Sequence, residues 1–113
     1  MDLILWHNPR CTKSRQTLAL LEELGLAPKI RLYLQDTPTE TEIRAALTAL
    51  GLPAHQLLRR GEAPYKALSL ASADDDTVIA AMAAHPILIE RPVVFHGDKA
   101  ALGRPPENVL DIL

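Results

Sequence analysis

The chain has 113 residues, which suffices for one compact domain and leaves no room for two of ordinary size. Hydrophobic residues make up 48% of it, enough for a core and too many for a disordered segment. The net charge of −2 gives no basic footprint for nucleic acid or an anionic membrane. We therefore predict a single domain over residues 1–113, and we expect a monomer.

The chain has one cysteine, Cys11. An internal disulfide, a Cys-x-x-Cys pair and a cysteine-rich zinc site are therefore excluded, and an unpaired thiol fits a reducing compartment. The first apolar run, Leu3–Trp6, is too short for a signal sequence, and no later run approaches the ~20 residues of a membrane span. We expect a cytoplasmic protein without a membrane segment.

The first third of the chain predicts a strand, a helix and a strand. Leu3–Trp6 is apolar and stops at the polar His7. A helix is then indicated by an apolar stripe at positions i, i+3, i+4 and i+7, and Gly25 can cap its end. A second strand over 30–34 follows from alternating apolar residues. The stripe consists of Thr17, Leu20, Leu21 and Leu24.

The middle of the chain predicts helices. Thr39 and Glu42 have the spacing of a capping box, and Gly51 ends the helix that they begin. Short helical turns over 54–70 are interrupted by Gly61 and Pro64. Acidic residues at 74–76 then suit the start of a further helix, which ends at position 86.

The last third predicts a hairpin and a final helix. Strands over 92–95 and 100–102 flank the turn sequence Gly97-Asp98, and Pro105 suits the first position of a helix. The opening strand–helix–strand unit implies parallel strands, and the hairpin adds antiparallel ones. We therefore predict an α/β protein of thioredoxin-like fold with a helical insertion, and a mixed sheet of about four strands flanked by helices.

The segment 7–15 joins the first strand to the first helix and contains Cys11. Unpaired N–H groups and the dipole at a helix start favour a thiolate. The basic Arg10, Lys13 and Arg15 add charge, and the Thr12 and Ser14 hydroxyls can donate hydrogen bonds, so these groups could hold an oxyanion beside the sulfur. Electropositive surroundings favour a reactive thiol over the alternative, a buried filler residue.

Two further residues of this segment are candidates for the site. His7 either tunes the thiol as a base or ion-pair partner, or caps the loop. Asn8 is expected to shape the loop near the site. The other histidines, His55, His85 and His96, suit helix ends or turns and have no metal-ligand spacing with Cys11, so no metal site is expected.

Three arginines stand at unusual positions. Arg59 precedes Arg60-Gly61, Arg91 precedes Pro92 at a strand start, and Arg104 precedes Pro105. Arginine can bind a tetrahedral oxyanion in a bidentate way, although surface charge remains the alternative for each of them. A proline at the start of the third strand is also where a thioredoxin-type fold has a cis peptide bond beside the catalytic sulfur.

Together these segments resemble the ArsC family of glutaredoxin-coupled arsenate reductases over nearly the whole chain. Four separated blocks in the right order carry the resemblance: the His-Asn-Pro-x-Cys of 7–11 with Ser14-Arg15, then 57–59 with Pro64-Tyr65, then 85–92, and finally Gly-Arg-Pro at 103–105.

The resemblance implies a role for each matching position. Cys11 would attack the arsenic, with a cis Pro92 beside it, and His7 and Ser14 would lower the cysteine pKa. The oxyanion would be bound by three arginines, with Thr12 and Lys13 as further ligands. Glutathione would be the co-substrate and glutaredoxin the partner, with no bound cofactor. The three arginines are Arg59, Arg91 and Arg104.

The chain departs from the family pattern around the cysteine. Family members usually have a small residue before it and Gly-Thr after it, where this chain has Arg10, Thr12 and Lys13. The pattern Arg-Cys-x-Lys-Ser-Arg indicates a sister subgroup. One alternative is a glutathione-dependent thiol oxidoreductase with another substrate. The other is a Spx-like regulator that binds RNA polymerase, whose Cys-x-x-Cys switch is lost here because position 14 is Ser14.

Overall fold

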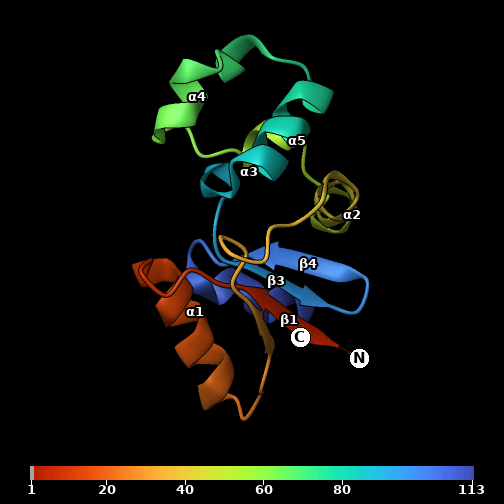
Figure 1. Ribbon diagram of the computed structural model, residues 1–113. Coiled ribbons are helices and arrows are strands. Elements are labelled where there is room, and N and C mark those ends of the chain that lie inside the picture. Colours follow the sequence, from red (N-terminus) through yellow and green to blue (C-terminus); the bar gives the residue numbers. More distant parts are fainter. Residues whose placement is uncertain (1) are drawn as a thin grey trace. The chain divides into compact units, whose positions relative to one another are not determined.

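The computed structural model describes residues 2–113, so Met1 of the predicted domain lies outside the described residues. The contacts within the chain define two compact units (Figure 1). The first unit runs to Asp36 and resumes at Arg91–Leu113, and the second is Thr37–Glu90. Each unit is described by itself.

The first unit contains a mixed four-stranded sheet in the order β2-β1-β3-β4. Its strands are β1 (Leu3–Trp6), β2 (Lys29–Arg31), β3 (Val93–His96) and β4 (Lys99–Leu102). β1 pairs in parallel with β2, whereas β3 is antiparallel to both β1 and β4. The helix α1 (Thr12–Glu23) forms the crossover between the parallel strands. The predicted α/β class and thioredoxin-like mixed sheet are confirmed.

One face of this sheet carries the core of the first unit. Leu5 of β1 lies opposite Val94 of β3, and both side chains are fully buried. Leu21 of α1 packs against them, as do Val109 and Ile112 of the 3₁₀ helix η3 (Pro106–Ile112). α1 and η3 therefore cover the same face, and this packing fixes the start of α1 relative to the end of β1.

Three boundaries in the first unit differ from the prediction. Leu24 is the C-cap of α1 rather than a member of its buried stripe, and it is 51% exposed because the helix ends before it. The second strand ends at Arg31, since the carbonyl of Leu32 accepts turn hydrogen bonds from the N–H groups of residues 35 and 36. The final helix is a 3₁₀ helix that begins after Pro105, which occupies the cap position.

The second unit is helical, as predicted for the insertion. Its α-helices are α2 (Glu40–Leu50), α3 (Ala54–Leu57), α4 (Ala63–Ala67) and α5 (Asp75–Ala84), with 3₁₀ turns η1 (Leu70–Ser72) and η2 (Pro86–Leu88). The predicted capping box of α2 is present, with hydrogen bonds of 3.0 and 3.1 Å between Thr39 and Glu42. Pro64 is the second residue of α4 rather than an interruption of helical structure, because proline suits a first turn.

Buried apolar side chains from α2, α3 and α5 form the interior of the second unit. The segment after η2 returns beside α3 through a bridge between Leu58 and Ile89. Within residues 2–113, no helix has the length and apolar character that a membrane crossing requires.

Candidate active site

Cys11 lies at the N-cap of α1, directly after the loop that leaves β1. Its extended backbone (φ −93°, ψ 124°) lets its carbonyl accept from the N–H of Arg15, while its own N–H donates to the Asn8 carbonyl; both bonds are 3.0 Å. The residue is 9% exposed. The chain therefore holds the thiol at a helix N-terminus, in a fixed position and largely shielded from water.

Asn8 and Ser14 organise the loop before the cysteine. The Asn8 side-chain oxygen accepts from the Arg10 N–H at 3.0 Å, and the Asn8 N–H donates to Ser14 Oγ at 3.0 Å. Both Asn8 and Ser14 are buried. These short-range bonds give the loop one defined conformation, because each polar group of the turn has a partner inside the chain.

The surroundings of the Cys11 sulfur favour its ionised form. Burial, the largest single effect, raises the pKa of the thiol, but three groups together outweigh it. The backbone N–H of Ser14, the hydrogen bond and charge of the Arg91 side chain, and the backbone N–H of Lys13 lower the Cys11 pKa, which lies below its ordinary value. Among residues 2–113 no capping hydrogen bond to the sulfur forms, so the two N–H groups act as nearby partial charges.

His7 is buried and bound to the loop. Its Nδ1 lies 2.6 Å from Ser14 Oγ, and its backbone N–H donates to the Arg31 carbonyl at 2.9 Å. Burial first, and then the charge of Arg15, lower the pKa of the imidazole, which favours its neutral form. His7 thus contacts Ser14, the residue whose N–H stabilises the thiolate.

Arg91 brings a guanidinium group to the sulfur from the segment before β3. Its side chain lies close enough to the sulfur for its N–H donors and its charge to lower the Cys11 pKa. Its Nε and Nη1 atoms are buried and have no hydrogen-bond partner among residues 2–113. Buried unpaired donors of this kind are costly, so they point to a ligand that completes their hydrogen bonds.

Arg104 lies next to Arg91. Its Nη1 donates to the Arg91 carbonyl at 3.2 Å, and its side chain is exposed. The peptide bonds Arg91–Pro92 and Arg104–Pro105 are both cis, and the first is the one that the resemblance implied. Two of the three predicted arginines are thus neighbours, and Arg91 reaches Cys11.

Gly103 determines the packing between β4, α1 and Pro92, whereas the sequence indicates it only as part of the Gly-Arg-Pro block. Its N–H donates to the Pro92 carbonyl at 3.0 Å, which fastens the end of β4 to the segment carrying Arg91. A Cβ at this position would collide with Thr17 Oγ1 and lie 2.7 Å from the Pro92 ring. Only glycine at position 103 allows the backbone to lie this close to both Thr17 of α1 and Pro92.

Arg59 belongs to the second unit and has its own local partners. Its Nη2 lies 3.7 Å from a Glu62 carboxylate oxygen, and its Nη1 lies 3.5 Å from one of Glu90. Its backbone N–H donates to the Leu88 carbonyl. Its Nε is buried and has no hydrogen-bond partner among residues 2–113, as for two nitrogens of Arg91. A role of Arg59 in binding the anion stays a prediction.

The basic and hydroxyl groups of the first helical turn have different surroundings. Arg15 donates from Nη1 to the Pro9 carbonyl at 2.9 Å and from Nη2 to Thr12 Oγ1 at 3.2 Å. Lys13 is half-buried, and its carbonyl accepts from Thr17 Oγ1 at 2.9 Å. Thr12 and Arg10 are exposed. Of the three cations predicted near the sulfur, Arg15 is thus the one bound to the loop.

The surroundings of His55 and His96 are in keeping with structural roles. His55 contacts the backbone carbonyl of Ala73, and His96 contacts that of Ile112. In the part of the chain from residue 2 onward, no three His, Cys, Asp or Glu side chains are grouped to hold a metal ion.

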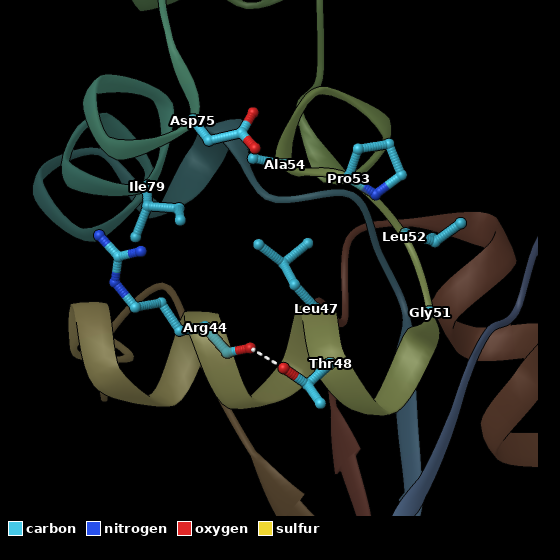
Figure 2. Close-up of a pocket in the computed structure, with 9 residues that line it drawn as sticks. All are labelled: Arg44, Leu47, Thr48, Gly51, Leu52, Pro53, Ala54, Asp75 and Ile79. Atoms are coloured by element: carbon cyan, nitrogen blue, oxygen red, sulfur yellow. Dashed lines mark hydrogen bonds between the residues drawn. The ribbon is translucent and has the colours of Figure 1, made fainter.

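Figure 2 shows a pocket within the second unit, between α2 and α5 and beside α3. Leu47 and Ile79 give it an apolar wall, and Arg44 stands at its side with an ion pair of 2.8 Å to Asp76. None of the site residues predicted from the sequence lines this pocket.

Comparison with known proteins gives matches over the whole chain. The model of the ArsC family matches residues 6–112. A Haemophilus influenzae protein named arsenate reductase is 46% identical over 116 residues, with all of both chains covered. Escherichia coli K12 "Uncharacterized protein YfgD" is also 46% identical, over 96% of this chain and 94% of that protein. The solved structure of "Arsenate reductase from Vibrio cholerae" has a TM-score of 0.96 and 46% identity, covering 100% of this chain and 98% of that one.

Proposed function

Because the chain belongs to the ArsC family, we propose that it is an arsenate reductase in which Cys11 is the nucleophile. The observation that carries the proposal is the pairing of a shielded thiol of lowered pKa with the Arg91 guanidinium, which has buried donors still unpaired among residues 2–113. A tetrahedral oxyanion beside the sulfur would satisfy those donors. The names of close relatives support arsenate as the substrate.

In the first step the Cys11 thiolate attacks arsenic. A sulfur–arsenic bond forms, an arsenic–oxygen bond breaks, and the oxygen leaves as water after protonation. Arg91 offsets the repulsion between thiolate and arsenate, and Arg104 beside it adds positive charge. From the resemblance, Arg59, Thr12 and Lys13 are proposed as further ligands of the anion.

The second step needs an outside thiol, because Cys11 is the chain's only cysteine. Glutathione attacks the Cys11 sulfur, the sulfur–arsenic bond breaks, and its electron pair stays on arsenic, which leaves as arsenite. The two thiols are thereby oxidised to a mixed disulfide, and arsenic is reduced from As(V) to As(III). Glutaredoxin then reduces the mixed disulfide. This chemistry fits the reducing cytoplasm, which we propose as the location.

The test is arsenate-dependent NADPH oxidation in the presence of glutathione, glutaredoxin and glutathione reductase. The wild-type protein should support turnover, and Cys11→Ser should abolish it because an alcohol is a far weaker nucleophile at neutral pH. Undiminished turnover in Cys11→Ser would refute the proposed mechanism.

A second candidate is a glutathione-dependent thiol oxidoreductase with another substrate. The departures from the family pattern at Arg10, Thr12 and Lys13 favour considering it. The same assay distinguishes the two candidate functions. Rapid formation of a Cys11–glutathione disulfide, without NADPH oxidation on adding arsenate, would favour the second candidate.

A further inference from the structure

The Arg15 side chain bridges the loop on both sides of the nucleophile. Its Nη1 donates to the carbonyl of Pro9, two residues before Cys11, and its Nη2 donates to the hydroxyl of Thr12, the residue after it. Its backbone N–H also donates to the Cys11 carbonyl. One exposed side chain therefore links the two ends of the short segment that presents the sulfur. We refer to this pair of side-chain bonds as the Arg15 brace.

The geometry separates Arg15 from the anion-binding arginines. Both of its terminal nitrogens already donate to the protein, whereas Arg91 has buried nitrogens without a partner among residues 2–113. A guanidinium group suits a brace because its planar donors diverge at fixed angles, which a lysine ammonium cannot reproduce.

Arg15 also lies close enough to His7 for its charge to matter. The His7 imidazole is buried and bound to Ser14, and after burial the Arg15 charge is the second cause that lowers its pKa. A protonated His7 would carry hydrogens on both ring nitrogens, so its Nδ1 could only donate to Ser14 Oγ across the 2.6 Å contact. Arg15 therefore helps to keep the imidazole neutral.

We infer that Arg15 is a positioning residue for the Cys11 reaction, which acts by bracing the loop at Pro9 and Thr12 rather than by binding the substrate anion. This inference rests on the proposed role of Cys11 as the nucleophile. It assigns a function to the arginine in the Cys-x-x-Ser-Arg sequence of this chain that is distinct from that of Arg91.

The test compares Arg15→Lys, which keeps the charge but cannot bridge two acceptors rigidly, with Arg15→Gln, which removes the charge. Lys29→Gln is the control, because it removes a charge from an exposed side chain of the same unit, on β2 and outside the segment 7–15. For each protein, the iodoacetamide alkylation rate of Cys11 is measured at pH 7, and His7 is titrated by NMR. Arsenate KM and kcat are measured in the coupled assay.

If the brace positions Cys11, both Arg15 variants should be alkylated about three- to tenfold more slowly than wild type, with lower kcat and little change in arsenate KM. Lys29→Gln should change the alkylation rate by less than about twofold. Arg15→Gln should raise the His7 pKa because it removes the charge. Arg15→Lys should not raise it, because it keeps the charge.

Two results would overturn the inference. One is an alkylation rate in Arg15→Lys equal to that of wild type, because any effect of Arg15 on Cys11 would then come from its charge alone. The other is a raised arsenate KM with unchanged kcat in both variants, which would make Arg15 an anion ligand. If wild-type Cys11 itself reacted like an ordinary thiol, the proposed function would fail instead, so the two failures are distinguishable.

Discussion

At the scale of single residues, the site depends on competing effects on one sulfur atom. Burial of Cys11 opposes its ionisation, and it is outweighed by the N–H groups of Ser14 and Lys13 together with Arg91. Such a balance can be altered by one substitution, since a change of one pKa unit corresponds to a tenfold change in thiolate at a pH below the pKa.

Arg91→Gln should weaken arsenate binding. The variant loses the charge and the two nitrogens, Nε and Nη1, that have no hydrogen-bond partner in the described part of the chain. Arsenate KM should therefore rise about tenfold to a hundredfold, which corresponds to the loss of one charge-assisted hydrogen bond. Steady-state kinetics check this, with Arg44→Gln on α2 as control because Arg44 pairs with Asp76 outside the predicted site. An unchanged KM in Arg91→Gln would remove Arg91 from the anion site.

His7 should make the protein less stable in acid. The pKa of His7 in the folded protein lies below the ordinary value of about 6.5. As the pH falls through about 6.5, the unfolded chain therefore binds more protons at this residue than the folded protein does. The free energy of unfolding should therefore decrease from pH 7.5 to pH 5.5. Urea unfolding at both pH values checks this, and His7→Gln should show a smaller decrease. An equal decrease in the variant would show that His7 does not contribute.

At the scale of the elements, the features that depend only on neighbouring residues were predictable from the sequence. The capping box at Thr39, the helix end at Gly51 and the hairpin turn at Gly97 follow from neighbouring residues and were predicted correctly. The end of β2 was not predictable from alternation, because the turn that begins at Leu32 overrides it. The 3₁₀ geometry of the last helix likewise depends on how it packs against α1 and the sheet.

Gly103→Ala should disturb the junction between β4 and α1. The new methyl group would collide with Thr17 and the Pro92 ring, so the free energy of unfolding should fall by about 1–3 kcal/mol, the usual cost of overpacking. Urea denaturation measures this. Gly61→Ala is the matched control, because a Cβ at Gly61 meets nothing within 4 Å, and its change should stay within about 0.5 kcal/mol. Equal stability of the two variants would contradict the packing argument.

At the scale of the whole molecule, the order of the elements was predictable, while the contacts that join distant segments were not. The parallel pairing of the first two strands, the antiparallel hairpin and the helical insertion followed from the order of strands and helices along the chain. The approach of Arg91 to Cys11 joins positions 80 residues apart, and only the resemblance had linked them before the structure was known. The Arg15 brace and the contacts of Gly103 depend on side-chain geometry that residue types do not specify.

The site is held to lower the pKa of the Cys11 thiol below that of a free cysteine, and alkylation with iodoacetamide across a pH series measures this pKa. Because the chain has one cysteine, the mass of the intact protein reports on this thiol alone. We expect the rate to rise with a midpoint clearly below the value of a free cysteine, about 8.5, and we expect Arg91→Gln to shift the midpoint upward. A wild-type midpoint at or above that of free cysteine would contradict it.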